Sequence, residues 1–195
     1  MKRLWVLSLA CLTGCAYLLE GEAPRALYTL KSDPVVAAQS RTLPALTVDL
    51  PFSDLSLDTP RIAVTPSLYQ RDYLAEGEWS DRLPKAVQDV LIDSFSQRWG
   101  GERVNRSLQT DQLLQTDIQD FSVYGLGSSA PYVQIKLLFK VVDFPNRRVI
   151  ASHLFCEKVP VVPCNFYGIV VAFNKGMNCL VGKAVVWREK VISHQ

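Results

Sequence analysis

The residue whose surroundings most clearly define a chemistry is Cys15, which closes the run Leu-Thr-Gly-Cys at positions 12–15. A basic start at positions 2–3 and an apolar stretch over 4–12 precede it, which is the pattern of a secretory signal. A Cys directly after Leu-Thr-Gly turns such a signal into a lipobox, in which the thiol is diacylated, the chain is cut before the Cys and the new amine is acylated. The sequence therefore predicts a signal peptide over residues 1–14; the alternative is an ordinary signal peptide with a chance Cys.

Acylation of Cys15 would fix the chain to a membrane. Each buried methylene adds roughly 0.8 kcal/mol of membrane affinity, and stable anchoring takes about two acyl chains, a number that a triacylated Cys exceeds. We interpret residues 15–25 as a lipidated tether. In many Gram-negative bacteria an Asp after the lipidated Cys retains a lipoprotein in the inner membrane, whereas this chain has Ala16. For a Gram-negative source, the sequence thus predicts an outer-membrane anchor facing the periplasm.

Size and charge describe the part that the anchor would carry. Removal of the signal leaves 181 of the 195 residues, enough for one domain with a substantial core, over residues 26–195. The net charge of +2 comes from Lys2 and Arg3, so the remaining chain has 19 basic and 19 acidic residues. Such a chain lacks a broad attraction for nucleic acid. No second stretch of about 20 uniformly apolar residues predicts a membrane span.

Three cysteines remain after the anchor, and their redox state is open. One alternative is a Cys156–Cys164 disulfide, because these two bracket a Pro-containing turn, with Cys179 left as a free thiol. The other is three buried thiols that pack as small hydrophobic groups.

Few other residues could perform chemistry. His153 lies in a predicted strand and His194 in the terminal tail, and no Ser stands in a recognisable nucleophile elbow. No Cys, His or acidic cluster has the spacing of metal ligands. Tyr69, Tyr73 and Trp79 precede a helix and are candidates for a partner or ligand surface; the alternative is rings at the rim of the core, with Trp79 as a hydrophobic staple. We therefore expect no enzyme activity, no metal and no cofactor.

Two long helices are predicted to organise these residues. The first begins at a Ser80 cap, tolerates Pro84 near its start and ends at Gly100-Gly101. Its core-facing stripe consists of Leu83, Val87, Val90, Leu91, Ser94 and Phe95. The second runs from Phe166 to Trp187 and is apolar on more than one side. Its valines, if exposed, would be a candidate oligomer surface.

About six strands complete the prediction, with residues 66–79 as a loop and 111–115 as at most a short helical turn. The strands cover residues 26–31, 45–50, 61–65, 118–124, 132–142 and 149–158, with a further short strand over 102–105. Strict alternation over 132–142 predicts a strand with one buried face. The predicted fold class is α+β, a mostly antiparallel or mixed sheet with two main helices packed on it.

Several short segments follow the lipobox in order along the chain. They are Leu27–Leu30, Val48–Pro51, Leu57–Val64, Glu78–Pro84 and Val171–Gly176. Together they resemble the ABC-type transport auxiliary lipoprotein family, which includes the paraquat-inducible lipoprotein C type, over nearly all of the mature chain.

This resemblance implies a non-catalytic docking or conduit role beside an ABC permease and ATPase whose substrate-binding subunit carries an MCE (mammalian cell entry) domain. Such systems move phospholipids or other hydrophobic molecules between inner and outer membranes. A ring-shaped homo-oligomer is also implied, because some members of the family form rings. Two alternatives are a structural envelope scaffold without a transport role and a small lipid-anchored hydrolase, which would need a nucleophile and a base in contact.

Overall fold

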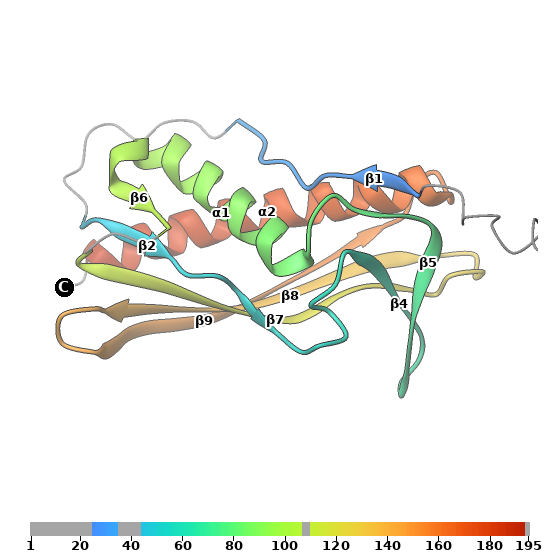
Figure 1. Cartoon of the computed structure of the whole chain (residues 1–195), viewed down its shortest axis with the longest axis horizontal. Helices are drawn as coiled ribbons and strands as arrows, with labels where there is room; N and C mark the ends of the chain where they lie inside the picture. Colours follow the sequence, from blue (N-terminus) through green and yellow to red (C-terminus); the bar gives the residue numbers. More distant parts are fainter. Residues whose placement is uncertain (1–24, 35–43, 107–109, 194–195) are drawn as a thin grey trace, which may run out of the picture.

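A nine-stranded mixed sheet forms the centre of the molecule, counted within residues 25–34, 44–106 and 110–193, which this computed structural model describes (Figure 1). The strands are β1 (Ala26–Tyr28), β2 (Leu46–Val48), β3 (Phe52–Ser53), β4 (Arg61–Ser67), β5 (Gln70–Trp79), β6 (Val104–Asn105), β7 (Gln112–Tyr124), β8 (Tyr132–Asp143) and β9 (Arg148–Pro160). The helices are α1 (Leu83–Trp99), a short 3₁₀ turn η2 (Gly101–Arg103) and α2 (Phe166–Ser193).

Strand β7 joins the two halves of this sheet. On one edge it pairs in antiparallel register with β8, which pairs with β9. On its other edge β2, β3 and β4 follow one another in parallel register, β5 pairs antiparallel with β4, and β1 pairs parallel with β5. The predicted α+β class with a mixed sheet is confirmed. The predicted short strand over 102–105 corresponds to β6, and two strands, β3 and β5, were not predicted, because β3 has only two residues and β5 lacks an apolar alternation.

Helix α2 is the main cover of the sheet. It packs on β8 and β9, and α1 lies beside it. Gly176 permits the close approach, since a Cβ there would stand 3.1 Å from Ile135 and 3.2 Å from Val159. By length and apolar composition the 28-residue α2 could cross a membrane, but 56% of its most apolar window is buried within the protein. The contacts with the sheet identify α2 as a core helix.

Aromatic rings hold α2 to the sheet. Phe173 of α2 stacks on Phe121 of β7 with ring centroids 4.7 Å apart, and Trp79 meets Phe173 edge-on at 5.5 Å. All three side chains are buried. Offset-stacked and edge-to-face pairs add about 0.5–1.5 kcal/mol beyond the area that they bury. This cluster therefore fixes the position of α2 against the strands.

The predicted core stripe of α1 is confirmed, because all six of its residues are buried. The predicted Ser80 cap is wrong: the helix begins at Leu83, with Arg82 at the N-cap position and no side-chain cap. Instead, the Leu83 N–H donates to the Thr59 carbonyl at 3.2 Å, so a loop partner satisfies this helix terminus.

Three strand predictions need correction. Strand β4 continues through Pro66, which is tolerated because the pairing with β7 ends at Thr65. Residues 70–79 form β5 instead of a loop; this strand is polar because much of it is exposed. Residues 112–115 belong to β7 and not to a helical turn, since pairing with both β2 and β8 imposes the extended conformation.

Candidate docking face

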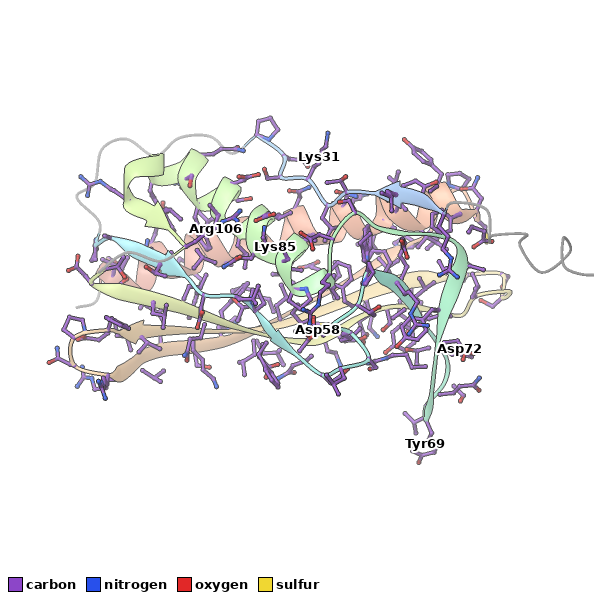
Figure 2. All side chains as sticks on the ribbon, in the orientation of Figure 1. Lys31, Asp58, Tyr69, Asp72, Lys85 and Arg106 are labelled. Atoms are coloured by element: carbon purple, nitrogen blue, oxygen red, sulfur yellow. The ribbon has the colours of Figure 1, made fainter. Side chains whose placement is uncertain are left out.

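The three aromatic residues predicted to share a surface do not lie together. Tyr69 sits in the turn between β4 and β5 with 95% of its surface exposed, at the projecting tip of the hairpin (Figure 2). Tyr73 is half-buried within β5, and Trp79 is only 2% exposed. The prediction of a surface role is wrong for Trp79, because the aromatic core takes up its ring. Tyr69 stays a candidate contact residue.

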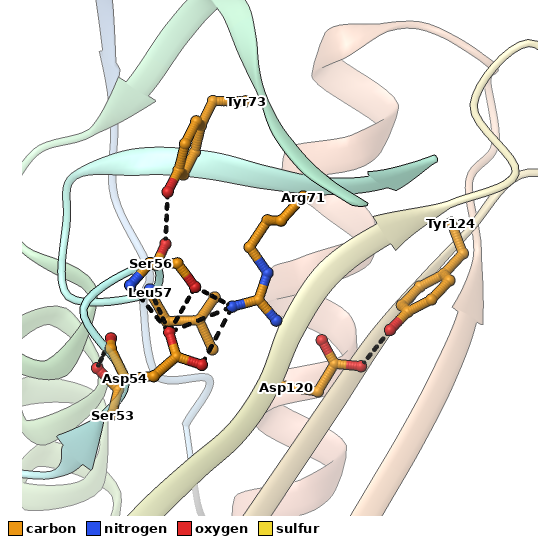
Figure 3. A network of polar contacts seen from close by, with 8 residues as sticks. All are labelled: Ser53, Asp54, Ser56, Leu57, Arg71, Tyr73, Asp120 and Tyr124. Atoms are coloured by element: carbon orange, nitrogen blue, oxygen red, sulfur yellow. Dashed lines mark hydrogen bonds and ion pairs between the residues drawn. The ribbon is translucent and has the colours of Figure 1, made fainter. Parts of the chain in front are cut away.

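Tyr73 instead fastens a loop to the hairpin. Its hydroxyl donates to the Ser56 carbonyl at 2.9 Å (Figure 3). The Arg61 guanidinium lies 3.7 Å above the Tyr73 ring. The loop in question runs from β3 to β4, over residues 54–60. A cation over an aromatic ring is worth roughly 0.5–1 kcal/mol at exposed sites. Tyr73 therefore positions the 54–60 loop against the β4–β5 hairpin.

Asp54 is the organising residue of the same loop. Its carboxylate accepts hydrogen bonds from the backbone N–H groups of Ser56 at 2.9 Å and Leu57 at 3.0 Å, a local turn typical of Asp. The turn places Leu57 in the core and leaves Leu55 90% exposed. This turn therefore exposes Leu55 and buries Leu57, which attaches the loop to the core.

Arg71 of β5 joins this turn to the hairpin. Its Nη1 lies 3.2 Å from each carboxylate oxygen of Asp54 and also donates to the Ser56 hydroxyl (Figure 3). Burial raises the pKa of Asp54, but the hydrogen bond from Ser56 and the charge of Arg71 outweigh it and hold that pKa below its ordinary value. The carboxylate is therefore ionised at neutral pH and can keep the loop and the hairpin together.

Large apolar side chains are exposed on both parts that Arg71 joins. Leu50, Phe52 and Leu55 are 56%, 72% and 90% exposed, and Leu68 and Tyr69 at the hairpin tip are 83% and 95% exposed. Asp54 adjoins Leu55 and Arg71 is two residues from Tyr69, so their ion pair joins the two segments that carry these groups. We call these five residues the docking face. Adjacent exposed apolar residues of this kind mark interaction sites.

A cavity of about 650 Å³ borders the docking face where the loop approaches the start of α1. Its apolar wall includes Leu50, Phe52 and Leu55, and Pro84 lines it from the helix. Charges of both signs stand at its rim, where Arg82 pairs with Asp58. An apolar hollow with a balanced polar rim has the character of a protein-binding surface.

A buried polar cluster supports the sheet behind this face. Asp120 Oδ2 accepts hydrogen bonds from the Tyr124 hydroxyl at 2.7 Å and the Gln134 amide at 2.6 Å. Burial and the neighbouring Asp120 raise the pKa of Tyr124 to about 12. Since this phenol keeps its proton at neutral pH and no nucleophile–base pair accompanies it in the described part of the chain, the cluster fits a structural role.

Other candidates from the sequence lie apart from the docking face. The ring of His153 packs near Phe155 and Trp187, with centroids at 4.4 and 6.0 Å. Among the residues that the structure describes, no group of three or more His, Cys, Asp or Glu side chains could hold a metal ion. Cys15 lies outside the described residues, so its lipidation stays a prediction.

Cys156, Cys164 and Cys179 are all free and exposed, so the predicted Cys156–Cys164 disulfide is absent and the alternative of three buried thiols is also wrong. Cys156 pairs with Lys136 inside the β8–β9 ladder, which runs on to Pro160, whereas Cys164 lies in the loop before α2, so the two do not bracket a tight turn. A disulfide needs Cα atoms within roughly 7 Å.

Three of the six valines of α2 are buried, Val191 is partly buried, and only Val171 and Val186 are exposed, at 41% and 47%. Of the valines predicted as a candidate oligomer surface, only these two, 15 residues apart, are exposed.

The fold and the exposed apolar residues define a sheet-and-helix domain with a docking face. Its architecture is similar to that of a Xanthomonas campestris protein of the DUF330 family, with a TM-score of 0.71 and 22% identity over 86% of this chain and 93% of that one. It is also similar to an uncharacterised protein with a TM-score of 0.66 and 14% identity, over 83% of this chain and 96% of that one. These likenesses establish the fold.

The sequence family described as the ABC-type transport auxiliary lipoprotein component matches residues 28–183, and the chain belongs to this family. An uncharacterised protein of Bradyrhizobium diazoefficiens is 31% identical over 182 residues, which are 90% of this chain and 48% of that protein. The chain thus spans about half the length of this curated relative.

Proposed function

We propose that this protein is the lipid-anchored auxiliary component of an MCE-type ABC transport system that moves phospholipids or other hydrophobic molecules between the inner and outer membranes. Its part is non-catalytic: it docks the transporter or forms part of the conduit. The family match over residues 28–183 carries this proposal, because it covers most of the domain. The fold-level likenesses add no information on substrate.

The anchor in this proposal is Cys15, diacylated on its thiol before residues 1–14 are removed and acylated on its new amine afterwards. The tether over residues 15–25 leads directly into β1. With Ala16 behind the acylated Cys, the proposed location is the outer membrane, with the domain facing the periplasm. Labelling with palmitate tests the anchor: wild type takes up label, and a Cys15→Ser variant that still takes it up would overturn the assignment.

The docking face supports a binding role. Its five large apolar side chains are exposed instead of being packed into the core, and the Asp54–Arg71 pair joins the loop that carries Leu55 to the hairpin that carries Leu68 and Tyr69. Aromatic and leucine side chains next to a hollow are able to act as anchors in a partner's surface. The proposed partner is the MCE-domain subunit, together with the permease and ATPase that it serves. A homo-oligomeric ring stays a prediction from the family resemblance.

Affinity capture of the acylated full-length protein from crosslinked membranes tests this function. We expect mass spectrometry to find an MCE-domain protein and its ABC permease with the wild type. Leu55→Asp should reduce their recovery, whereas the matched control Val171→Asp, at an exposed position of α2, should not. Recovery of cell-wall or unrelated envelope proteins alone would replace the transport function with the structural scaffold role.

A further inference from the structure

A second set of exposed apolar residues lies at the end of the domain where β1 begins, directly after the tether. Figure 1 shows the start of β1, the start of α2 and the turn between β7 and β8 at this same end, while the end of α2 lies at the other. Leu27 of β1, Leu126 of the β7–β8 turn, Val162 before α2 and Tyr167 in its first turn are 64%, 50%, 74% and 66% exposed. We call these four residues the anchored end.

Short contacts make the anchored end one rigid unit. Tyr28 of β1 packs on Phe166 of α2 with ring centroids 4.9 Å apart. The Val161 N–H donates to the Pro131 carbonyl at 2.9 Å, which joins the loop before α2 to the start of β8. Asn165 Oδ1 accepts from the Gly168 N–H at 2.8 Å and caps the helix. The exposed apolar residues are therefore presented at fixed positions.

Gly168 is required by this packing. A Cβ on this residue would stand 1.9 Å from the carbonyl oxygen of Pro163, a distance that no side chain could accommodate. The loop before α2 is thus folded tightly over the first turn of the helix. Val162, the residue before Pro163 in this loop, is exposed.

An apolar cavity of about 300 Å³ opens within the anchored end. Leu126, Phe166 and Ile169 line it, with Leu74 from β5, and Glu76 is the one charged side chain in its lining. The lining of this cavity contains no Lys or Arg, so it has none of the basic clusters that bind anionic headgroups. Its chemistry fits the zwitterionic interface of a bilayer, where Tyr and apolar side chains partition together.

The tether alone would not fix the orientation of the domain. The 11 residues from Cys15 to Arg25 span at most roughly 36–40 Å when fully extended, which leaves the domain free to turn. We propose that the anchored end seats on the lipid bilayer, with Leu27, Val162 and Tyr167 in the interfacial zone. The docking face would then point along the membrane or away from it. This inference depends on the proposed lipidation of Cys15.

Two positions on one helix provide a matched test. Tyr167 and Val186 are both exposed on α2 and lie 19 residues apart, which is about 28 Å along the helix axis. Tyr167→Trp and Val186→Trp therefore place equivalent probes near and far from the proposed bilayer contact. The full-length chain, produced in a lipidating host, is reconstituted into phosphatidylcholine vesicles with brominated acyl chains, and the fluorescence of wild type serves as the blank.

We expect bromine to quench most of the added fluorescence of Tyr167→Trp and almost none of that of Val186→Trp, with little change on addition of salt. Adding Val162→Asp to Tyr167→Trp should reduce the quenching. Equal quenching at both positions, or at neither, on protein whose acylated mass is verified, would overturn the seating surface and leave the anchor intact. Recovery of the chain without acylation at Cys15 would overturn both.

Discussion

The helix-covered face and the open face of the sheet are built from alternate residues of the same strands. On β7, Phe121 points toward α2 and stacks on Phe173, whereas Ser122 and Asp120 are on the opposite face. The helix side is a continuous apolar core, and the open side of β7 carries the buried polar residues Asp120 and Ser122. The docking face, by contrast, exposes its apolar residues on a loop and a hairpin outside the core. We therefore expect substitutions on the helix side to change stability and substitutions on the docking face to change partner binding.

The largest effect is expected on the helix side. Phe173→Ala removes the ring between Trp79 and Phe121 and should lower the free energy of unfolding by about 3–5 kcal/mol. On the docking face, Phe52→Ala should change it by no more than about 0.5 kcal/mol, because that ring is 72% exposed. Urea denaturation followed by circular dichroism measures both. Equal losses would contradict the division of roles between the faces.

A smaller loss of stability is expected from Arg188→Ala near the end of α2. This buried guanidinium donates to the Pro44 carbonyl and to Gln112 Oε1, both at 3.0 Å, and lies 4.5 Å from the ring of Trp99. Its removal leaves two acceptors without this donor and should cost about 1–3 kcal/mol. Lys183→Ala, which removes an exposed partner of Glu157, is the control and should be nearly neutral in the same denaturation experiment.

Arg71→Ala should have a modest effect on stability, about 1 kcal/mol or less, because its pair with Asp54 is partly exposed. It should nevertheless reduce partner capture, since the loop that carries Leu55 is no longer fastened to the hairpin.

The pH dependence of stability provides a second readout. The lowered pKa of Asp54 stabilises the fold above its unfolded value of 3.8, and this contribution disappears as pH falls through the lower folded pKa. The free energy of unfolding of Arg71→Ala should therefore fall less than that of wild type as the pH is lowered through this range. An unchanged acid dependence together with unchanged capture would show that the pair does not position the face.

The smallest expected effect concerns Tyr124 on the open face. Burial and Asp120 raise its pKa from 10.0 to about 12, so the folded protein holds this proton more tightly than the unfolded chain. The resulting stabilisation is fully present below pH 10 and is lost as pH rises through 12. Ultraviolet titration should show one tyrosine ionising late, and Tyr124→Phe should remove it. Loss of the late step in Tyr69→Phe instead would contradict the assignment.

The two faces also differ in how far the sequence predicts them. The core stripe of α1 and the alternation of β8 are predictable because burial on one side imposes a period on the residue types. Strand β5 has no such period, since pairing with β1 and β4 holds a polar segment extended. Trp79 is ambiguous for a related reason: one aromatic residue before a helix fits either a surface or a core.

The docking face could not be predicted as a unit. Its residues belong to the connection before β4 and to the tip of the β4–β5 hairpin, and long-range contacts such as the Asp54–Arg71 pair and the Tyr73–Ser56 hydrogen bond join these segments. An apolar residue in an irregular segment carries no pattern that tells exposure from burial, as Leu55 and Leu57 illustrate, being 90% and 1% exposed.

Site-specific photocrosslinking in living cells tests most directly whether this protein binds a transport partner through its docking face. A photoreactive amino acid at Leu55 probes the docking face, and the same group at Val171 probes the helix side at an exposed position. We predict that an MCE-domain protein is crosslinked from Leu55 and not from Val171. Crosslinking of that protein from Val171 alone, or from neither position in cells where it is present, would contradict the proposed docking face.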